Sequence, residues 1–525
     1  MKLRRCLLLA AVGALLNLGI SGCGNSEEFV FTQGAVVNPN VPPTANLDNY
    51  LSVGNAPLSI PAARGVLAND QLNGGSISSF QSTGTAGGTV QLADDGSFIY
   101  NPPFGFTGND TFTYTLANSA GESSTTVTIS MQNLAFFVDN TAPDGGDGSF
   151  NSRFNMMSQA TAAAGPNDFI AVFRGDGTSD GLAGTIQLQD GQKLIGEGAG
   201  FTADAALLLR SDEVNSQTIL PAGDPAVLTG PVLLADGNLV AGFLIDGSGS
   251  DGIFGDSING ATIENNEFQN YTESGVDFLN ASGNLQILRC TFHQVAMRDG
   301  VTLSNTNTDA DLTLNENIFT DDGAETRSCA DINVLDANST LDFVCNDNQV
   351  LFESELWFRG FLLTSNGTST FRADGNMIQG DGISGLSAAT LESTGTIDLT
   401  WTDNSIVGGK EMTVSAFDGS QIEGEIRGNT VDTEGELNQE GIAVSLADDR
   451  VDGDGSSANL TIVENTLTGA ESGHDNSSDQ GDLECGITVQ ARSNSVFNST
   501  IEGNVISGWR HGIWFIGEGF LFSEV

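Results

Sequence analysis

Acidic residues gather in three segments of the second half of the chain, at 432–441, 447–457 and 468–486. Calcium takes several carboxylate and carbonyl oxygens, so acids spaced along a loop can hold it. The candidate ligands are Asp432, Glu434, Glu436, Asp449, Asp452, Asp454, His474, Asp475, Asp479 and Asp482. The segment 447–457 lacks the full twelve-residue calcium-loop pattern and its closing glutamate. Two interpretations stay open here, a calcium site or acidic loops that are simply solvated.

Residues that could act as catalytic bases or stack on sugars are fewer. The basic candidates are Arg289, Arg298, Arg327, Arg359, Arg372, Lys410 and Arg427. We interpret them as members of surface ion pairs, with His293 able to join the arginines on one flank. Trp357 is the aromatic candidate for ligand binding, because aromatic faces stack on sugars; plain packing is the alternative.

A short repeated pattern must position these residues. It ends on an apolar residue in nine copies, at Phe268, Phe292, Phe319, Val350, Ile378, Ile406, Val431, Leu467 and Ile506. Five residues before each of these stands another apolar or small residue. Two residues before each stands an asparagine, except in the second copy, where Cys290 replaces it.

This register predicts a strand, a tight bend and another strand. Asparagine suits the bend because it tolerates left-handed backbone angles, and stacked amides can bond one another in a ladder. A second strand recurs between copies, as in "SGVDF" (274–278) and "EGIAV" (440–444). The copies follow one another after 24 to 39 residues, which is typical of a solenoid with loop insertions. No apolar period of 3.6 residues is long enough for paired helices. Stacking would set the acidic segments 432–441 and 468–486 side by side.

The spacing, the asparagine position and the glycine-led strands resemble the right-handed parallel β-helix of the pectate-lyase-like superfamily. The resemblance covers residues 134–525, with helix propensity at 151–163 similar to that family's N-terminal cap. It implies either lyases that use carboxylate-bound calcium and a basic residue, or hydrolases with paired aspartates. The hydrolase signatures do not occur as a set. The stretch 511–525 has no polar cap, so we expect a missing C-terminal cap or capping by another molecule.

Residues 41–133 have a different pattern of apolar and polar residues. Short alternating segments such as "SFIYNP" (97–102) and "TFTYTLAN" (111–118) predict a β-sandwich. The runs at 65–72 and 94–116 resemble cadherin-like or immunoglobulin-like (Ig-like) modules of bacterial surface proteins, which serve as spacers, sometimes with calcium. We interpret Asp48, Asp70 and Asp110 as surface acids, with carboxylate ligation as the alternative.

The first 22 residues read as a signal peptide, with basic residues before a short apolar run. Ile20-Ser21-Gly22-Cys23 resembles a bacterial lipobox, which implies cleavage before Cys23 and lipidation of that residue. Residues 23–40 would form a tether, and Gly24 lacks the acidic character of an inner-membrane retention signal. We therefore expect an outer-membrane lipoprotein exposed at the cell surface. An ordinary secretory signal is the alternative.

The charge and the cysteine content exclude several classes of protein. The chain has 18 basic and 67 acidic residues, and the signal removes three basic ones, so the mature charge is 15 − 67 = −52. Such a field repels nucleic acid, and a polyanionic glycan would need bridging cations. Cys290, Cys329, Cys345 and Cys485 are too sparse for a disulfide scaffold or a zinc site, although a Cys329–Cys345 bridge is possible.

These observations predict an all-β lipoprotein that adheres to a polysaccharide or another cell surface, or binds glycans, through its β-helix loops. A calcium-dependent polysaccharide lyase or a glycoside hydrolase is the first alternative. A purely structural surface scaffold is the second.

Overall fold

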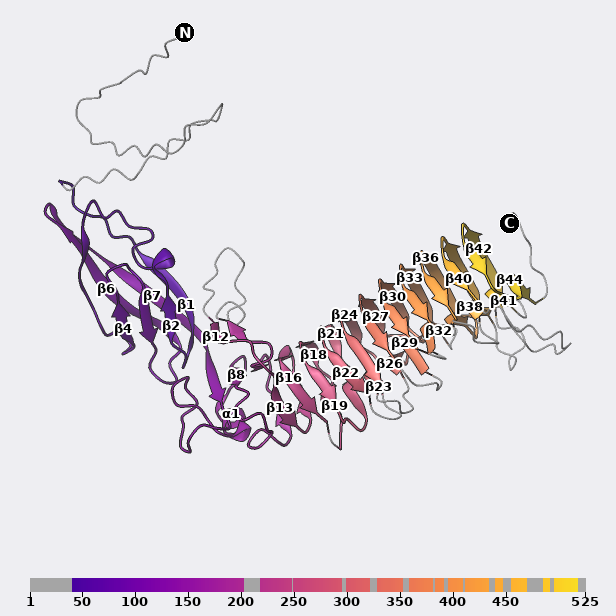
Figure 1. The fold of residues 1–525 in the computed structure, drawn as a ribbon, viewed down its shortest axis with the longest axis horizontal. Coiled ribbons are helices and arrows are strands. Elements are labelled where there is room, and N and C mark those ends of the chain that lie inside the picture. Colours follow the sequence, from indigo (N-terminus) through magenta and orange to yellow (C-terminus); the bar gives the residue numbers. More distant parts are fainter. Residues whose placement is uncertain are drawn as a thin grey trace, which may run out of the picture. The chain divides into compact units, whose positions relative to one another are not determined.

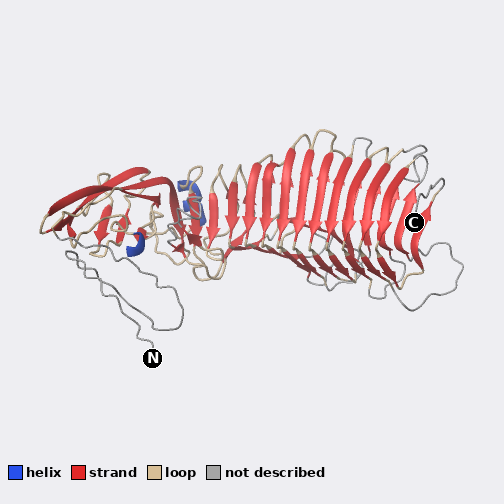
Figure 2. Cartoon of the chain, turned by 90° about the horizontal axis from the view of Figure 1, so that it is seen from above, coloured by secondary structure: helices blue, strands red, loops and turns tan. Residues whose placement is uncertain are grey.

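The computed structural model describes residues 40–202, 218–247, 249–294, 299–321, 328–352, 358–380, 383–390, 395–408, 411–433, 440–446, 455–469, 485–491 and 495–517. The chain divides into two compact units, 1–132 and 133–525. Strands dominate both units, as Figure 2 shows. Among the described residues, no helix is long and apolar enough to cross a membrane.

The first unit is built from antiparallel strands. Its elements are β1 (Asp48–Gly54), β2 (Leu58–Ile60), the 3-10 helix η1 (Ala62–Arg64), β3 (Ser76–Phe80), β4 (Thr89–Leu92), β5 (Phe98–Asn101), β6 (Gly108–Asn118) and β7 (Gly121–Val138). Strands β3, β6 and β7 form one sheet, to which β1 adds, and β2, β5 and β4 form another. Tyr50, Phe98 and Phe112 pack edge to face in the core, at ring separations of 4.9 and 5.8 Å. The predicted Ig-like sandwich is confirmed.

Two of its acids are buried, which makes the prediction of surface acids wrong for Asp48 and Asp110. They are 7 % and 1 % exposed. Asp110 accepts hydrogen bonds from five groups, the backbone N–H of Ala86 (2.7 Å), Gly88 (3.0 Å) and Thr111 (2.8 Å) and the hydroxyls of Tyr100 (2.8 Å) and Thr85 (3.2 Å). Burial opposes ionisation of Asp110, but these hydrogen bonds outweigh it and lower its pKa.

The second unit is a parallel β-helix with three sheets, which confirms the predicted fold class (Figure 1). After the last residues of β7, sheet A contains β8 (Phe169–Val172), β10 (Lys193–Gly196), β15 (Asn238–Ala241), β18 (Asn259–Glu264), β21 (Ser282–Leu288), β24 (Asp309–Asn315), β27 (Thr340–Asn346), β30 (Thr368–Asp374), β33 (Thr396–Thr402), β36 (Gln421–Arg427), β39 (Ser457–Val463) and β42 (Val496–Glu502).

Sheet B contains β13 (Ala226–Thr229), β16 (Phe243–Asp246), β19 (Glu267–Gln269), β22 (Thr291–Gln294), β25 (Ile318–Asp321), β28 (Gln349–Leu351), β31 (Met377–Gln379), β34 (Ser405–Val407), β37 (Thr430–Asp432), β40 (Thr466–Thr468) and β43 (Val505–Ser507). Sheet C contains β9 (Ile186–Gln187), β14 (Val232–Leu233), β17 (Ile253–Asp256), β20 (Ser274–Leu279), β23 (Asp299–Asn305), β26 (Ser328–Val334), β29 (Phe358–Ser365), β32 (Ile383–Thr390), β35 (Glu411–Ala416), β38 (Glu440–Leu446), β41 (Cys485–Ala491) and β44 (His511–Ile516). A short antiparallel pair, β11 (Phe201–Thr202) and β12 (Thr218–Leu220), lies outside the three sheets.

Each coil visits sheets C, A and B in turn, and the repeated pattern spans the bend from A to B. The asparagines of this bend form the predicted ladder. Asn348 Nδ2 donates to Asn376 Oδ1 at 2.9 Å and to the Leu314 carbonyl at 2.8 Å, while Asn348 Oδ1 accepts from the Asn317 backbone N–H at 2.9 Å. The same contacts continue through Asn376, Asn404, Asn429, Asn465 and Asn504.

The structure corrects one detail of the bend. The residue with a left-handed backbone is the one before the ladder asparagine, such as Asn265 (φ 52°), Glu316 (φ 57°) and Asp403 (φ 53°). The ladder asparagine is therefore selected by its buried amide contacts and not by tolerance of positive φ. At Cys290 the thiol lies 3.7 Å from the Ile263 carbonyl, the acceptor that an asparagine amide would use.

Aromatic rings stack along the core on sheet B. Phe268, Phe292 and Phe319 are parallel, with ring centroids 4.7 and 4.9 Å apart. The glycines that open the sheet C strands make room for these rings. A Cβ on Gly300 would lie 2.8 Å from the Phe319 ring and 2.7 Å from the Cys329 carbonyl. In the three coils that carry Phe268, Phe292 and Phe319, the glycine leaves room for the ring.

At the start of the β-helix stands α1 (Met157–Ala163), shorter than the helix propensity over 151–163 predicts. Met157 and Ala160 are buried against the first coil. Residues 151–154 belong instead to a loop in which Phe154 bridges to Val138. The four described cysteines are buried and none of them is in a disulfide, so the possible Cys329–Cys345 bridge is not formed. At the other end, Val505 and Ile513 are exposed in the last described coil, and residues 518–525 lie outside the described part.

Candidate functional site

Most of the predicted calcium ligands fall outside the described residues. These are Glu434, Glu436, Asp449, Asp452, Asp454, His474, Asp475, Asp479 and Asp482, and the same holds for Trp357 and Cys23. Asp432 is described and ends β37, where it lies in register with Thr468 of β40. Glu440 and Cys485, where the next sheet C strands begin, are also in register. The ends of the two acidic segments therefore lie in adjacent strands. Within the described ranges, no group of three or more acid, histidine or cysteine side chains is arranged to hold a metal ion.

Three of the four described basic candidates form the surface ion pairs that we inferred for them, and Arg359, exposed on β29, forms none with the described residues. Arg289 pairs with Glu264 at 2.5 Å, Arg372 with Asp342, and Arg427 with both Glu425 and Glu464. His293 contacts Glu267 Oε1 and Thr320 Oγ1, each at 2.9 Å. Arg298, Arg327 and Lys410 lie outside the described residues.

One acidic group on sheet C was missed by sequence reasoning. We call it the carboxylate network: Asp251, Glu273, Ser274, Asp277 and Thr302. Asp251 accepts the Ser274 backbone N–H at 2.9 Å, and Thr302 Oγ1 contacts Asp277 at 2.5 Å and Ser274 Oγ at 3.2 Å. Consecutive coils supply its members, because β17, β20 and β23 are neighbours in the sheet.

Two acids of the carboxylate network, Asp251 and Asp277, have a raised pKa. Burial raises the pKa of Asp251 to about 6, and the nearby charges of Asp277 and Glu273 add to the rise against the Ser274 hydrogen bond. Burial also raises the pKa of Asp277, helped by Glu273 and opposed by Thr302. Carboxyl groups with such shifted values can donate a proton near neutral pH.

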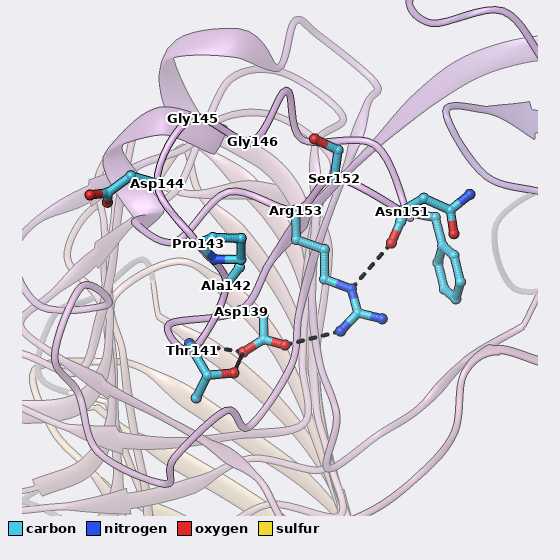
Figure 3. Close-up of a pocket in the computed structure, with 11 residues that line it drawn as sticks. Asp139, Thr141, Ala142, Pro143, Asp144, Gly145, Gly146, Asn151, Ser152 and Arg153 are labelled. Carbon is cyan, nitrogen blue, oxygen red and sulfur yellow. Dashed lines mark hydrogen bonds and ion pairs between the residues drawn. The ribbon is translucent and has the colours of Figure 1, made fainter.

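A pocket of about 480 Å³ lies in the loop between β7 and α1, and we call it the Arg153 pocket. Figure 3 shows its lining, which comprises Asp139, Thr141, Ala142, Pro143, Asp144, Gly145, Gly146, Phe150, Asn151, Ser152 and Arg153. Its volume is within the usual range for small-ligand sites.

Arg153 is fixed in this pocket from several sides. Its Nη1 donates to Asp139 Oδ2 at 2.9 Å and its Nε to the Phe150 carbonyl at 3.2 Å, while its guanidinium stacks 3.6 Å from the centroid of Phe173. The Asp139 side chain is 14 % exposed, and Thr141 donates to its other oxygen through both N–H and hydroxyl. Burial opposes ionisation of Asp139, but Thr141 and Arg153 outweigh it and lower the pKa.

The remaining lining of the pocket is polar with one aromatic ring. Asp144, which Figure 3 shows at the far side from Arg153, accepts a hydrogen bond from Asn155 at 2.7 Å. Asn151 and Ser152 add amide and hydroxyl groups, and Phe150 adds its ring. An arginine has five N–H donors, and acceptors among the described residues take the Nε hydrogen and one on Nη1. A ligand oxygen can therefore bind at Nη2.

Comparison with known protein families agrees with the architecture of the first unit. A model of the bacterial Ig domain matches residues 40–130. Among solved structures, the chain is similar to a family 28 exopolygalacturonase of Yersinia enterocolitica, with 12 % identity over 80 % of this chain and 85 % of that one and a TM-score of 0.30. It is also similar to XylC in complex with xylose, with 8 % identity over 71 % and 86 % and a TM-score of 0.21. Comparison with curated proteins found no match. The family match gives the Ig domain, and the sheet topology described above gives the parallel β-helix.

Proposed function

We propose that the protein binds neutral glycans, and that the Arg153 pocket is a sugar-binding site. The supporting observation is the fixed guanidinium, which bonds Asp139 and the Phe150 carbonyl through Nη1 and Nε and lines the pocket together with Phe150, Asn151 and Ser152. Sugar hydroxyls accept from such a donor and bond to amides and hydroxyls, while the C–H face of a sugar packs on an aromatic ring.

Charge favours a neutral ligand over a uronate. Asp139 already balances Arg153, and Asp144 adds a further negative charge to the lining. The whole chain carries −49. A carboxylated sugar would therefore meet repulsion both in the pocket and at a distance.

A matched pair of arginine variants tests this proposal. Arg153→Lys keeps the positive charge beside Asp139 but removes the planar donor fork. We expect it to lose at least about tenfold in affinity for neutral oligosaccharides, measured by calorimetry or on a glycan array. Arg372→Lys, on the outer face of sheet A, should bind like the wild type. Wild-type binding by Arg153→Lys, or binding of no neutral glycan at all, would reject the pocket.

The setting we propose for this activity is the outer surface of a bacterium. Lipid on Cys23 would anchor the chain in the outer membrane, the Ig domain would act as a spacer, and a polysaccharide or another cell would be the partner. Mass spectrometry of the N-terminal peptide should show a lipidated Cys23. In Cys23→Ser cells, fractionation should find the chain outside the membrane fraction.

The carboxylate network supports a second candidate, hydrolysis of a glycosidic bond. Glycosidases combine a carboxylic acid that protonates the leaving oxygen with a second carboxylate, and the raised pKa of Asp251 beside Asp277 suits this division of roles. New reducing ends should appear on incubation with neutral polysaccharides and be lost in Asp251→Asn. Asp311→Asn, an exposed acid of sheet A, is the control. Retention of glycan without new ends would leave binding as the function.

Calcium remains a proposal for the acidic segments that contain Asp432, Asp449 and Asp479. Calorimetry with calcium alone should show saturable binding that weakens in Asp479→Asn. A chain that binds neither calcium nor any glycan would be a structural scaffold.

A further inference from the structure

The buried hydroxyl of Tyr114 in the Ig domain meets more acceptors than it can serve. It lies 2.6 Å from Asp70 Oδ2, 2.9 Å from the Val66 carbonyl and 3.3 Å from Asp48 Oδ2. A tyrosine hydroxyl has one hydrogen to donate. The short contact to Asp70 has the length of a hydrogen bond to a charged carboxylate, so that is where the hydrogen belongs.

Because the Tyr114 hydrogen is donated to Asp70, a hydrogen bond between Tyr114 and Asp48 requires a second proton, carried by Asp48. Two carboxylates on one hydroxyl would leave Asp48 facing an oxygen lone pair in the protein interior, which is unfavourable. A protonated Asp48 resolves this, because its O–H donates to the Tyr114 oxygen while its other oxygen accepts from Asn69 Nδ2 at 3.1 Å. With Asp48 protonated, a chain of two hydrogen bonds, which we call the relay, runs from Asp48 through the Tyr114 hydroxyl to Asp70.

Among the described residues, no positively charged group acts on Asp48 in place of that proton. Asp70 repels Asp48, Asn69 donates to it, Tyr114 contacts it through the hydroxyl oxygen, and Tyr50 of the same strand donates its hydroxyl to the Arg64 carbonyl of η1 at 3.0 Å. Burial raises the pKa of Asp48 to about 7, Asp70 raises it further, and the two hydrogen bonds only partly offset this. The same burial and the same two acids raise the pKa of Tyr50.

The relay ends on the segment that leads into the Ig domain. Asp70 Oδ1 accepts the Asn46 backbone N–H at 2.7 Å, and Asn46 Nδ2 donates to the Asn69 carbonyl at 2.7 Å. Asn69 Nδ2 donates in return to the Leu47 carbonyl at 3.1 Å, and Thr44 pairs with Gln71. Asn46 and Leu47 are therefore held by residues in contact with Asp48 or Tyr114, whereas Val41, Pro42 and Ala45 are held separately by Asn118, Asn73 and Ser123.

We propose that Asp48, Tyr114 and Asp70 form a proton-dependent latch, closed when Asp48 is protonated and loosened when it ionises, that fastens Asn46 and Leu47, the end of the segment 40–47, to Asn69 and Asp70. The direction follows from linkage. An acid whose folded pKa is raised above its unfolded value of roughly 3.9 stabilises the closed form at low pH, and that stability is lost as the pH rises toward 7. The segment is therefore held in mildly acidic surroundings and released in alkaline ones.

Hydrogen–deuterium exchange of the full chain tests the latch. Peptides covering 40–47 are followed from pH 5 to pH 9, with rates divided by the intrinsic chemical rates. Opening should become easier by up to about tenfold per pH unit within the transition, as expected for one linked proton. Asp48→Asn mimics the protonated acid, so its peptides should stay protected at every pH.

Asp70→Asn provides a second, independent variant. It removes the charge that repels Asp48, so the transition should remain but move to lower pH. Asp95→Asn, an exposed acid of the same domain, should leave the wild-type profile unchanged. A flat wild-type profile, a wild-type transition in Asp48→Asn, or an unmoved midpoint in Asp70→Asn would each overturn the proposal.

Discussion

The Ig domain and the β-helix bury polar groups in opposite ways. In the β-helix, one neutral amide is used repeatedly, and each ladder asparagine bonds the next at 2.8–3.0 Å. In the Ig domain, single carboxylates are buried, and each has its own set of donors, as Asp110 and Asp48 do. The ladder is uncharged and insensitive to pH, whereas each buried acid depends on its protonation state.

The difference follows from the two topologies. Parallel coils place equivalent residues directly above one another, so one contact can be repeated along the whole stack. In an antiparallel sandwich, equivalent residues do not stack on one another in this way. Each buried polar group therefore needs its own set of hydrogen-bond partners. All four tryptophans lie in the β-helix and three of the four tyrosines in the Ig domain, so spectroscopy can follow the two units separately.

The largest effect is expected from breaking the ladder at its middle. Asn404→Ala removes the acceptor of the Asn376 backbone N–H and amide and the donor to Asn429, which leaves buried groups without partners. We expect a loss of about 4 kcal/mol in unfolding free energy, measured in urea by tryptophan fluorescence. Asn459→Ala, exposed on β39, should change stability little, and equal losses in both variants would contradict the ladder's role.

Next comes Asp110→Asn in the Ig domain, where the new amide would point N–H groups at backbone donors. The expected loss is about 3 kcal/mol, read from tyrosine signals. Because the folded pKa of Asp110 is lowered, its stabilisation is present above the unfolded value of roughly 3.9 and is lost as the pH falls through the folded value. The variant should lack that acid-dependent loss. If the variant still lost stability as the pH falls, another acid would be responsible for that loss.

A smaller effect is expected where glycine and ring meet in the β-helix. Gly300→Ala would press a methyl group against the Phe319 ring, and we expect about 2 kcal/mol of destabilisation. Gly512 starts the equivalent strand of the last described coil, where a Cβ would meet nothing within 4 Å. Gly512→Ala should therefore change the melting temperature little. Equal melting temperatures for the two variants would contradict the view that Gly300 is needed to make room for the Phe319 ring.

The smallest effect should be a gain. Cys290→Asn supplies the missing amide, which can donate to the Ile263 carbonyl and bond Asn266 and Asn317 on either side. We expect about 1 kcal/mol of stabilisation over the wild type, and none in Cys290→Ala. A destabilised Asn variant would mean that the site is shaped for the thiol.

The sequence carried much of the fold because its repeats are visible in one chain. The asparagine two residues before an apolar position predicted the bend between sheets A and B, and the segments that begin with glycine predicted the strands of sheet C. The Arg153 pocket was missed because helix propensity over 151–163 was read as a longer helix, although the glycine-rich stretch 144–148 signals a loop. Asp110 could have been placed inside, since it alternates with Phe112 and Tyr114 along β6.

The sequence by itself determined a repeating β-fold, an Ig domain and a strongly acidic chain, because period and composition are local properties. Only the tertiary structure decided which acids meet. Asp251 and Asp277 come together because adjacent coils stack, and Asp48 and Asp70 because separate strands and loops converge on Tyr114. Proximity across the fold, and the burial that comes with it, is what changes the chemistry of a carboxylate.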